Sequence, residues 1–239
     1  MNIGAFFDID GTLYRDSLMI AHFKKLVKYE VVDPLNWYEH VEKSYKEWIK
    51  RRGNYEDYME ELAEVYIQSI KDLNKEDTAF ITQQVIDLKG DAVYQFTRNQ
   101  IEFHKKMGHK VFFISGSPDY LVEAMGEKYG VTGCRGTKYL TDEKGNFTGE
   151  VIRMWDSESK SIAIADFTKH YDLDLSQSYA YGDTNGDYTM ITQVGNGYAI
   201  NPTQELLNRL KDQPNVKIIV ERKDVIYNLT PLVDRLDMT

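Results

Sequence analysis

The sequence predicts an α/β protein: a Rossmann-like, doubly wound parallel sheet with a helical cap inserted after the first strand. Two features of the chain predict this class. Short apolar runs that end in polar or turn-forming residues alternate with stretches of helical spacing, which is typical of a parallel sheet covered by helices. One range, 17–88, shows helical spacing only, so we expect it to interrupt the alternation as an insertion.

The first element is a short apolar run at residues 3–9, which ends in Asp10 and the turn-forming Gly-Thr pair. A continuous apolar run of this length is typical of a buried central strand. The apolar residues that follow lie on four helical stripes, at residues 19–27, 37–48, 58–70 and 80–86. We therefore expect 17–88 to form a helical cap domain, and 1–16 with 89–239 to form the α/β core.

The aromatic side chains of the insertion allow two interpretations: the hydrophobic core of the insertion, or a cage for a quaternary ammonium group. Helical spacing favours the core, because an apolar stripe at that period normally faces one. The residues concerned are Trp37, Tyr38, Tyr45, Trp48, Tyr55, Tyr58 and Tyr66.

After the insertion the two patterns alternate again. In chain order they predict a helix at 92–107, a strand at 110–115, a helix from Ser117-Pro118, a β-hairpin at 134–153 and a helix at 158–171. The last apolar runs predict three strands, at 179–181, 198–200 and 216–220.

Composition and charge exclude several classes of protein. The 239 residues are 42% hydrophobic and 28% charged, as in ordinary globular domains, and 29 Lys+Arg against 38 Asp+Glu give a net charge of −9. That balance argues against a nucleic-acid surface built on positive potential. No apolar stretch approaches the length of a membrane span, and the first apolar run is too short for a signal peptide, so we expect no membrane partner.

The single cysteine, Cys134, excludes an internal disulfide and suits a reducing compartment. Its surroundings in the sequence favour an inert, packed thiol. A cytoplasmic location is therefore expected, and the oligomeric state stays open.

Polar side chains follow three of the predicted strands directly. They are Asp8 and Asp10, then Ser115, Gly116 and Ser117, then Asp183 and Asp187. Ligands of open parallel sheets bind beyond the carboxyl ends of the strands, so these residues are expected to meet in one crevice. Carboxylates gathered there repel one another unless a cation lies among them, and oxygen ligands suit Mg²⁺. The sequence therefore predicts a magnesium site.

The pair Asp8 and Asp10 can divide two chemical roles between its members. Alternate strand residues face opposite sides, but at a strand end the backbone turns and both can reach the crevice. One carboxylate can stay ionised as a nucleophile while the other holds a proton as general acid or base.

Four ordered motifs resemble those of the haloacid-dehalogenase superfamily. They are residues 7–13 (FDIDGTL), residues 114–117 (ISGS), Lys160, and residues 181–187 (YGDTNGD). The helical insertion directly after the first motif resembles the C1-type cap of the phosphoserine-phosphatase-like branch, subfamily IB. The resemblance spans nearly the whole chain. One Asp-Gly-Thr sequence alone fits an ordinary turn as well as a catalytic loop, whereas four motifs in this order are very hard to obtain by accident.

The resemblance implies a Mg²⁺-dependent phosphomonoesterase that works through an aspartyl-phosphate. Asp8 would attack phosphorus, and Asp10 would protonate the leaving alkoxide and then activate water. Lys160 would neutralise charge between nucleophile and phosphate, while Ser115 and the Gly116 amide would hold phosphoryl oxygens.

The resemblance also implies the metal ligands and the size of the substrate. Mg²⁺ would be held by the Asp8 carboxylate, the Asp10 main-chain carbonyl and Asp183, with Asp187 in reach directly or through water. A cap over the crevice would exclude bulky molecules, so a small phosphate ester is the expected partner.

Three positions bear on the substrate. Ser17 stands where phosphoserine phosphatases carry the glutamate that grips the amino group, and Gly186 stands where that branch usually has asparagine. Arg15, at the junction with the cap, could meet a second anionic group of the substrate or lie at the surface beside Asp16.

Two other functions fit the same motifs. A phosphotransferase or mutase would pass the phosphoryl group from Asp8 to an alcohol instead of water. A noncatalytic module would bind metal and phosphate only, and it is disfavoured because both Asp8 and Asp10 are present.

Overall fold

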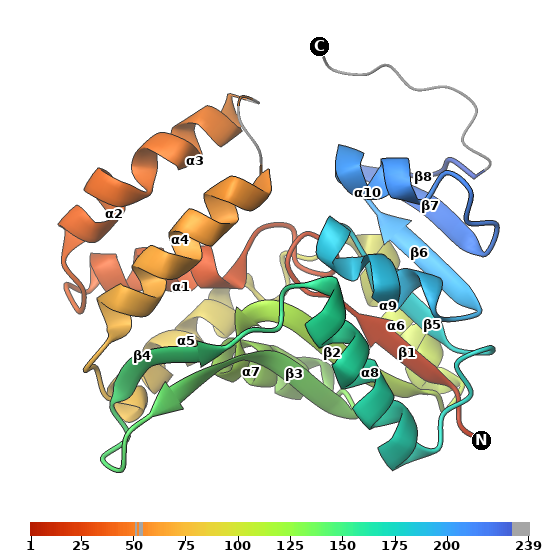
Figure 1. Cartoon of the computed structure of the whole chain (residues 1–239), viewed down its shortest axis with the longest axis horizontal. Coiled ribbons are helices and arrows are strands. Elements are labelled where there is room, and N and C mark those ends of the chain that lie inside the picture. Colours follow the sequence, from red (N-terminus) through yellow and green to blue (C-terminus); the bar gives the residue numbers. More distant parts are fainter. Residues whose placement is uncertain (51, 53–54, 231–239) are drawn as a thin grey trace.

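The computed structural model describes residues 1–50, 52 and 55–230, and the expected range 89–239 therefore ends in nine residues, 231–239, outside the described part. The chain forms one twisted sheet with helices on both faces and a helical cap at one side (Figure 1). The strands are β1 (Gly4–Phe7), β2 (Lys110–Pro118), β3 (Gly133–Thr141), β4 (Phe147–Ile152), β5 (Tyr179–Gly182), β6 (Asn196–Ile200), β7 (Val216–Arg222) and β8 (Val225–Asn228). The predicted fold class is confirmed.

The sheet has the strand order β4-β3-β2-β1-β5-β6-β7-β8, so β1 lies in its interior between β2 and β5. The pairs from β3 to β7 are parallel, and only the outermost strands, β4 and β8, run antiparallel to their neighbours. The β3–β4 hairpin was predicted from its turn. The edge strand β8 was not, because its residues are exposed and show no buried apolar run.

Alternate residues of β1 anchor the two faces of the sheet. Phe6 stacks on Phe112, which packs against Phe167 of α8 (Ser157–Tyr171). Phe7 faces the other side, where its ring lies 4.2 Å from that of Tyr181. This period of two follows from strand geometry, and burying aromatic rings on both faces makes β1 the centre of the core.

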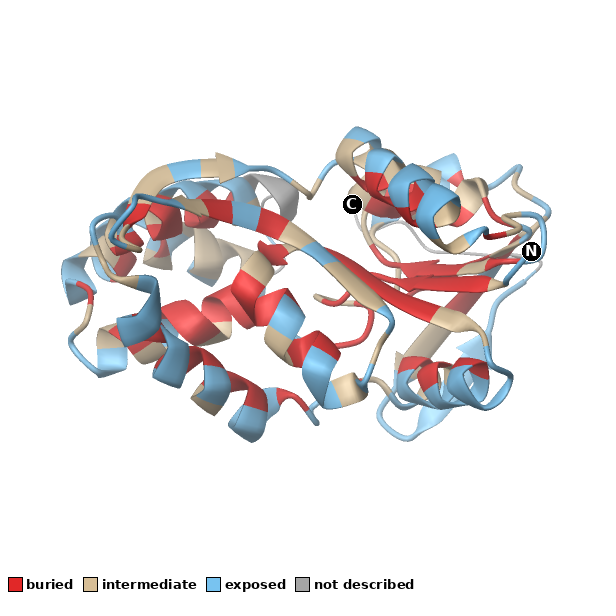
Figure 2. Ribbon diagram, turned by 90° about the horizontal axis from the view of Figure 1, so that it is seen from below, coloured by how far each residue is buried: buried red, intermediate tan, exposed pale blue. Residues whose placement is uncertain are grey.

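Helices cover both faces of the sheet. α8 and α9 (Tyr188–Thr192) pack on the Phe6 side, whereas α6 (Gln95–Lys106) and α7 (Asp119–Tyr129) pack on the Phe7 side. A short 3-10 turn, η1 (Asn185–Asp187), precedes α9, and α10 (Gln204–Arg209) follows β6. Figure 2 shows buried residues along the central strands and on the inner sides of helices in both halves of the molecule. In the described ranges no helix is long and apolar enough to cross a membrane.

Two predicted helix starts were wrong by a few residues. The helix expected from residue 92 begins at Gln95, because Tyr94 is extended and its amide donates to the Leu13 carbonyl at 2.9 Å. The helix expected from Ser117-Pro118 begins at Asp119, because β2 continues through Pro118 in an extended conformation. Both segments are held by pairing with neighbouring chain, which local propensity does not report.

The insertion holds five helices in the described part of the chain where four were predicted. They are α1 (Leu18–Lys28), α2 (Pro34–His40), α3 (Glu42–Ile49), α4 (Tyr55–Ile70) and α5 (Lys75–Lys89). The predicted helix at 37–48 is split at Val41, which ends α2 and precedes α3. Its apolar stripe continues across the break, so periodicity alone could not reveal it.

Aromatic residues of the insertion form its core, as predicted. Trp37, Tyr58 and Tyr66 are buried, and Tyr45 and Trp48 pack against them. Tyr38 is exposed, and the side chain of Tyr55 lies outside the described part.

The β3–β4 hairpin also belongs to the environment of the cap. The amide of Asp72 donates to the Phe147 carbonyl at 2.8 Å, and the amide of Phe147 donates to the Leu73 carbonyl at 2.9 Å. α4 packs along β4 as well. We propose that the cap comprises residues 17–88. The hairpin belongs to the core, and its backbone hydrogen bonds to the cap join the two parts.

Candidate active site

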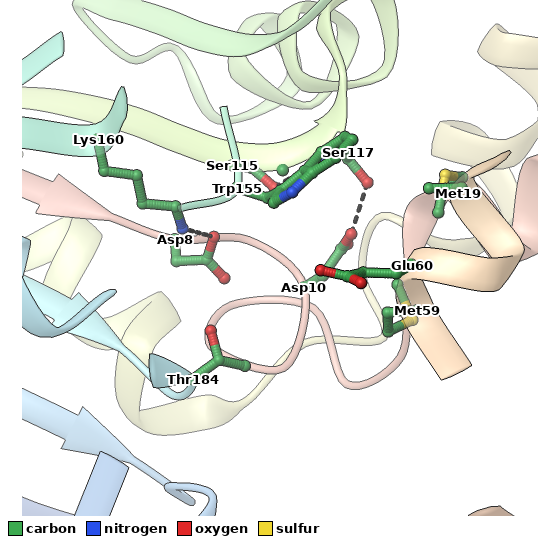
Figure 3. A pocket seen from close by; sticks show the side chains of 12 residues that line it. Asp8, Asp10, Met19, Met59, Glu60, Ser115, Ser117, Trp155, Lys160 and Thr184 are labelled. Carbon is green, nitrogen blue, oxygen red and sulfur yellow. Dashed lines mark hydrogen bonds and ion pairs between the residues drawn. The ribbon is translucent and has the colours of Figure 1, made fainter. Parts of the chain in front are cut away.

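The site lies where the loops after β1, β2 and β5 meet (Figure 3). β1 is paired with β2 on one side and β5 on the other, and all three are parallel. Their carboxyl ends therefore open at the same edge of the sheet. This arrangement brings Asp8, Ser115 and Asp183 together from positions far apart in the chain.

Asp8 and Lys160 form a buried ion pair at the centre of this edge. The Lys160 Nζ donates to Asp8 Oδ1 at 2.8 Å and to Asp187 Oδ1 at 2.5 Å. Burial raises the pKa of Asp8 well above its ordinary value, and Lys160 opposes that shift. Burial disfavours the Lys160 ammonium, but the Asp187 and Asp8 carboxylates outweigh it and raise the pKa of Lys160. The lysine is therefore a fixed positive charge beside Asp8.

Three buried carboxylates form a cluster that could hold a metal ion. One oxygen from each of Asp8, Asp183 and Asp187 lies within 4.8 Å of the others. Burial, and then the Asp8 and Asp187 charges, raise the pKa of Asp183 well above its ordinary value. Such a shift means that the ionised cluster lacks positive charge, and an oxygen-only donor set of this kind fits Mg²⁺.

Asp187 is the member of the cluster least free to bind a metal directly. Its Oδ1 accepts from Lys160, while its Oδ2 accepts from the amides of Asp183 and Thr184, both at 3.0 Å. The Asp187 carboxylate therefore holds the loop after β5 in shape. Of the two expected modes, direct contact or contact through water, these bonds favour water for Asp187.

Asp10 points away from the carboxylate cluster. Its side chain accepts from the Leu18 amide at 2.9 Å, from Ser17 Oγ at 3.3 Å and from Ser117 Oγ at 2.5 Å. Burial raises the pKa of Asp10 to about 6, and these hydrogen bonds limit the rise. The carboxyl group can thus gain and lose a proton near neutral pH. Because this side chain points away from the cluster, the main-chain carbonyl of Asp10 is the atom that could bind a metal.

A pocket of about 170 Å³ opens between these residues and the cap. The core lines it with Asp8, Asp10, Ser115, Gly116, Ser117, Trp155, Lys160 and Thr184. The cap lines it with Met19, Met59, Glu60 and Ala63. The predicted residues Asp8, Asp10, Ser115, Gly116 and Lys160 therefore share one pocket.

Some lining residues were not predicted. Ser117 was expected at this edge of the sheet but was given no role, and the structure shows its hydroxyl donating to Asp10. Met59, Glu60 and Trp155 carry no signal in the sequence, because only the orientation of α4 and of the loop before α8 brings them to the pocket.

The structure explains the departure at Gly186. A Cβ atom at this position would lie 2.2 Å from the main-chain oxygen of Trp155, and one at Gly116 would lie 2.8 Å from the Trp155 Cβ. An asparagine side chain does not fit at position 186, because the Trp155 main-chain oxygen occupies the space that its Cβ atom would need. The glycines let the Trp155 segment close one side of the pocket.

Ser17 and Arg15 have different surroundings. Ser17 is buried at the start of α1, where its hydroxyl accepts from the Ile20 amide and donates to Asp10. Arg15 is exposed, is not among the residues that line the pocket, and its guanidinium lies 5.6 Å from the centre of the Tyr94 ring. The structure does not bring Arg15 together with the other predicted site residues.

Residues 5–192 match the family described as haloacid dehalogenase-like hydrolase, and the chain belongs to this family. The inhibition of morphological differentiation protein of Streptomyces azureus is 27% identical over 204 residues, which cover 84% of this chain and 73% of that protein. A probable phosphatase of Mycobacterium tuberculosis is 26% identical, covering 84% of this chain and 70% of its own length.

The fold is that of phosphoserine phosphatase. A solved phospho-aspartyl intermediate analogue of phosphoserine phosphatase has a TM-score of 0.62 and 19% identity, and the comparison covers 93% of this chain and 95% of that chain.

Proposed function

We propose that the protein is a Mg²⁺-dependent phosphomonoesterase that hydrolyses a small phosphate ester through an aspartyl-phosphate on Asp8. One observation carries this proposal: the buried Asp8 carboxylate lines the pocket with Lys160 fixed 2.8 Å from one of its oxygens. The family membership and the relative named a probable phosphatase support it.

The proposed reaction has two steps. In the first, an Asp8 oxygen bonds to phosphorus, the ester P–O bond breaks, and protonated Asp10 gives its proton to the leaving oxygen. In the second, Asp10 takes a proton from water, the water oxygen bonds to phosphorus, and the bond to Asp8 breaks, which releases phosphate. Lys160, Ser115 and the Gly116 amide would stabilise the charged phosphoryl oxygens.

The residues present fit a bound Mg²⁺. The Asp8 and Asp183 carboxylates and the Asp10 carbonyl would hold the ion, with Asp187 contributing through water. When bound, it would supply positive charge against the phosphoryl oxygens. A reducing, cytoplasmic location goes with this proposal, because Cys134 lacks any cysteine partner in the sequence.

The test is an assay of small phosphate esters with Mg²⁺ on the wild type and on Asp8→Asn. We expect phosphate release by the wild type, a phosphorylated enzyme in acid-quenched samples by mass spectrometry, and no turnover in Asp8→Asn. Asp91→Asn, the same change at an exposed residue outside the pocket, is the matched control. Steady turnover by purified Asp8→Asn would overturn the nucleophile assignment.

The phosphotransferase alternative is tested in the same assay. Adding an alcohol acceptor and measuring the acceptor phosphate against free phosphate separates transfer from hydrolysis.

A substrate contact by Arg15 stays a prediction. Its position over Tyr94 favours a surface role. The variant Arg15→Ala is assayed on one ester with a second anionic group and on one without it. A lower kcat/KM than the wild type on the anionic ester alone supports a substrate contact. Wild-type kinetics on both esters would assign Arg15 to the surface.

A further inference from the structure

We propose that Glu60 of α4 binds a positively charged group on the leaving alcohol, so that the preferred substrates are monophosphate esters of amine-bearing alcohols. This inference rests on the proposed phosphatase function and names its substrate class.

The pocket has two chemically different sides. The phosphate side carries Asp8, Ser115, Gly116 and Lys160. The leaving-group side is formed by the four lining residues of the cap, Met19, Met59, Glu60 and Ala63. Figure 3 shows the Glu60 side chain reaching from α4 into the pocket toward the loop that carries Asp10.

Asp10 connects the two sides. In the proposed reaction it protonates the leaving oxygen, so the carbon atoms of the leaving alcohol must extend from Asp10 toward the cap. There they would contact the side chains of Met19 and Met59, while Glu60 supplies a carboxylate at the same side.

The charges on the leaving-group side select a cation. Among the described residues, Glu60 makes no hydrogen bond or ion pair, so its carboxylate is free to accept one from a ligand. Lys160 is the one cationic side chain among the described pocket-lining residues, and it already bridges Asp8 and Asp187. A carboxylate on the leaving group would therefore be repelled by Glu60 and would have no free cation to pair with. An ammonium on the leaving group would form an ion pair with Glu60.

The neighbours of Glu60 suit the same ligand. Methionine side chains are adaptable and apolar, so they can pack on the methylene groups of an amino alcohol. The Trp155 ring already carries the Arg153 guanidinium 4.9 Å from its centre, so Glu60 is the group that would pair with the ammonium. Hydrophobic packing with one carboxylate at its end thus matches a short alkyl chain that ends in an amine.

The experiment compares 2-aminoethyl phosphate with propyl phosphate, which has nearly the same shape without the charge. The measured quantity is the ratio of their kcat/KM values in each variant, because intrinsic reactivity cancels when variants are compared. Glu60→Gln is expected to lower this ratio roughly tenfold, mainly through KM, as loss of a charged hydrogen bond in a part-exposed pocket would. Glu60→Lys should shift preference toward phosphoglycolate, which carries a carboxylate.

Glu64→Gln is the matched control. Glu64 lies one turn further along α4, is exposed, and is not among the pocket-lining residues, so the same loss of charge there should leave the ratio unchanged. An equal ratio in the wild type and in Glu60→Gln would overturn the inference, while hydrolysis of propyl phosphate would leave the phosphatase proposal intact.

A binding measurement tests the subsite without turnover. Calorimetry on Asp8→Asn protein is expected to give tighter binding of 2-aminoethyl phosphate than of propyl phosphate, and Glu60→Gln added to that variant should remove the difference. Equal binding of both esters before the Glu60 change would overturn the inference. Absence of hydrolysis of every ester by the wild type would instead overturn the proposed function.

Discussion

Asp8 and Asp10 stand two residues apart but have opposite surroundings. Asp8 is paired with Lys160, whereas Asp10 accepts hydrogen bonds from neutral donors, the Leu18 amide and the Ser17 and Ser117 hydroxyls. Burial raises the pKa of both carboxyl groups, more for Asp8 than for Asp10, and Lys160 only limits the rise at Asp8. A cation bound at the carboxylate cluster would lower the pKa of Asp8 further, and the two environments then suit the separate roles of nucleophile and acid that we propose.

The pKa of Asp10 makes a prediction about pH dependence. With this pKa at about 6, the protonated fraction falls as pH rises through 6, so kcat/KM for an alkyl phosphate should decline above that pH. p-Nitrophenyl phosphate needs no proton on its leaving group and should decline less. Ser117→Ala removes a hydrogen bond that lowers the pKa of Asp10, so the decline should move to higher pH. Identical pH profiles for both esters would contradict the acid role.

The close contact between Gly186 and the Trp155 main chain leads to a second prediction. Gly186→Ala places a methyl group 2.2 Å from the Trp155 carbonyl oxygen, so the Trp155 segment must move. We expect a loss of about 1–3 kcal/mol in the free energy of unfolding, measured with urea, together with a lower kcat/KM because Trp155 lines the pocket. Unchanged stability and activity would show that this contact is not limiting.

At the scale of elements, a buried chain of hydrogen bonds links the cap to the core. The Tyr66 hydroxyl of α4 contacts His22 Nδ1 of α1 at 2.7 Å and the Tyr120 hydroxyl of α7 at 2.5 Å. Thr82 of α5 contacts the other nitrogen of His22 at 3.3 Å. Burial lowers the pKa of His22 to about 3, so the ring stays neutral and can both donate and accept. Four helices are thereby held in one arrangement.

Tyr66→Phe tests this chain. The change removes the central hydroxyl and leaves His22 and Tyr120 short of a partner inside the protein, so the free energy of unfolding in urea should fall by about 1–3 kcal/mol. Tyr29→Phe, which removes an exposed hydroxyl bonded to Gln84, is the matched control and should change stability by less than about 0.5 kcal/mol. Equal effects of the two changes would mean that the buried chain contributes little.

At the scale of the whole molecule, parallel strands gather negative charge at one edge of the sheet. Asp8 follows β1, and Asp183 and Asp187 follow β5, so their carboxylates are buried together with Lys160 as the ammonium between them. This arrangement is costly without a cation, because burial raises the pKa values of Asp8 and Asp183. Metal binding should therefore stabilise the fold itself.

Thermal unfolding with and without Mg²⁺ tests that expectation. A concentration a hundredfold above Kd should stabilise the wild type by about 2.7 kcal/mol, and a chelator should reverse the gain. Asp183→Asn should remove the response to Mg²⁺, yet raise stability without metal, since it deletes one of the mutually repelling carboxylates. Asp91→Asn should keep the wild-type response. A wild-type Tm that ignores Mg²⁺ would contradict the proposed metal site.

Local patterns along the chain were enough to predict the fold class, most of the elements, and the residues that meet at the strand ends. Apolar periodicity is a local property, and it identified β1, β2 and the β3–β4 hairpin. Because the carboxyl ends of parallel strands open at one edge, the order of strands and polar residues along the chain was enough to group Asp8, Ser115 and Asp183.

The tertiary structure alone decided which side chains of the cap face the pocket. Glu60 and Glu64 look alike in the sequence, and only the orientation of α4 against the sheet puts the first at the pocket and leaves the second outside its lining. In the same way, the position of Trp155 against Gly186, the chain through Tyr66 and the exposed edge strand β8 depend on contacts between distant segments. Periodicity reports that a residue is buried or exposed, but it does not report what the residue meets.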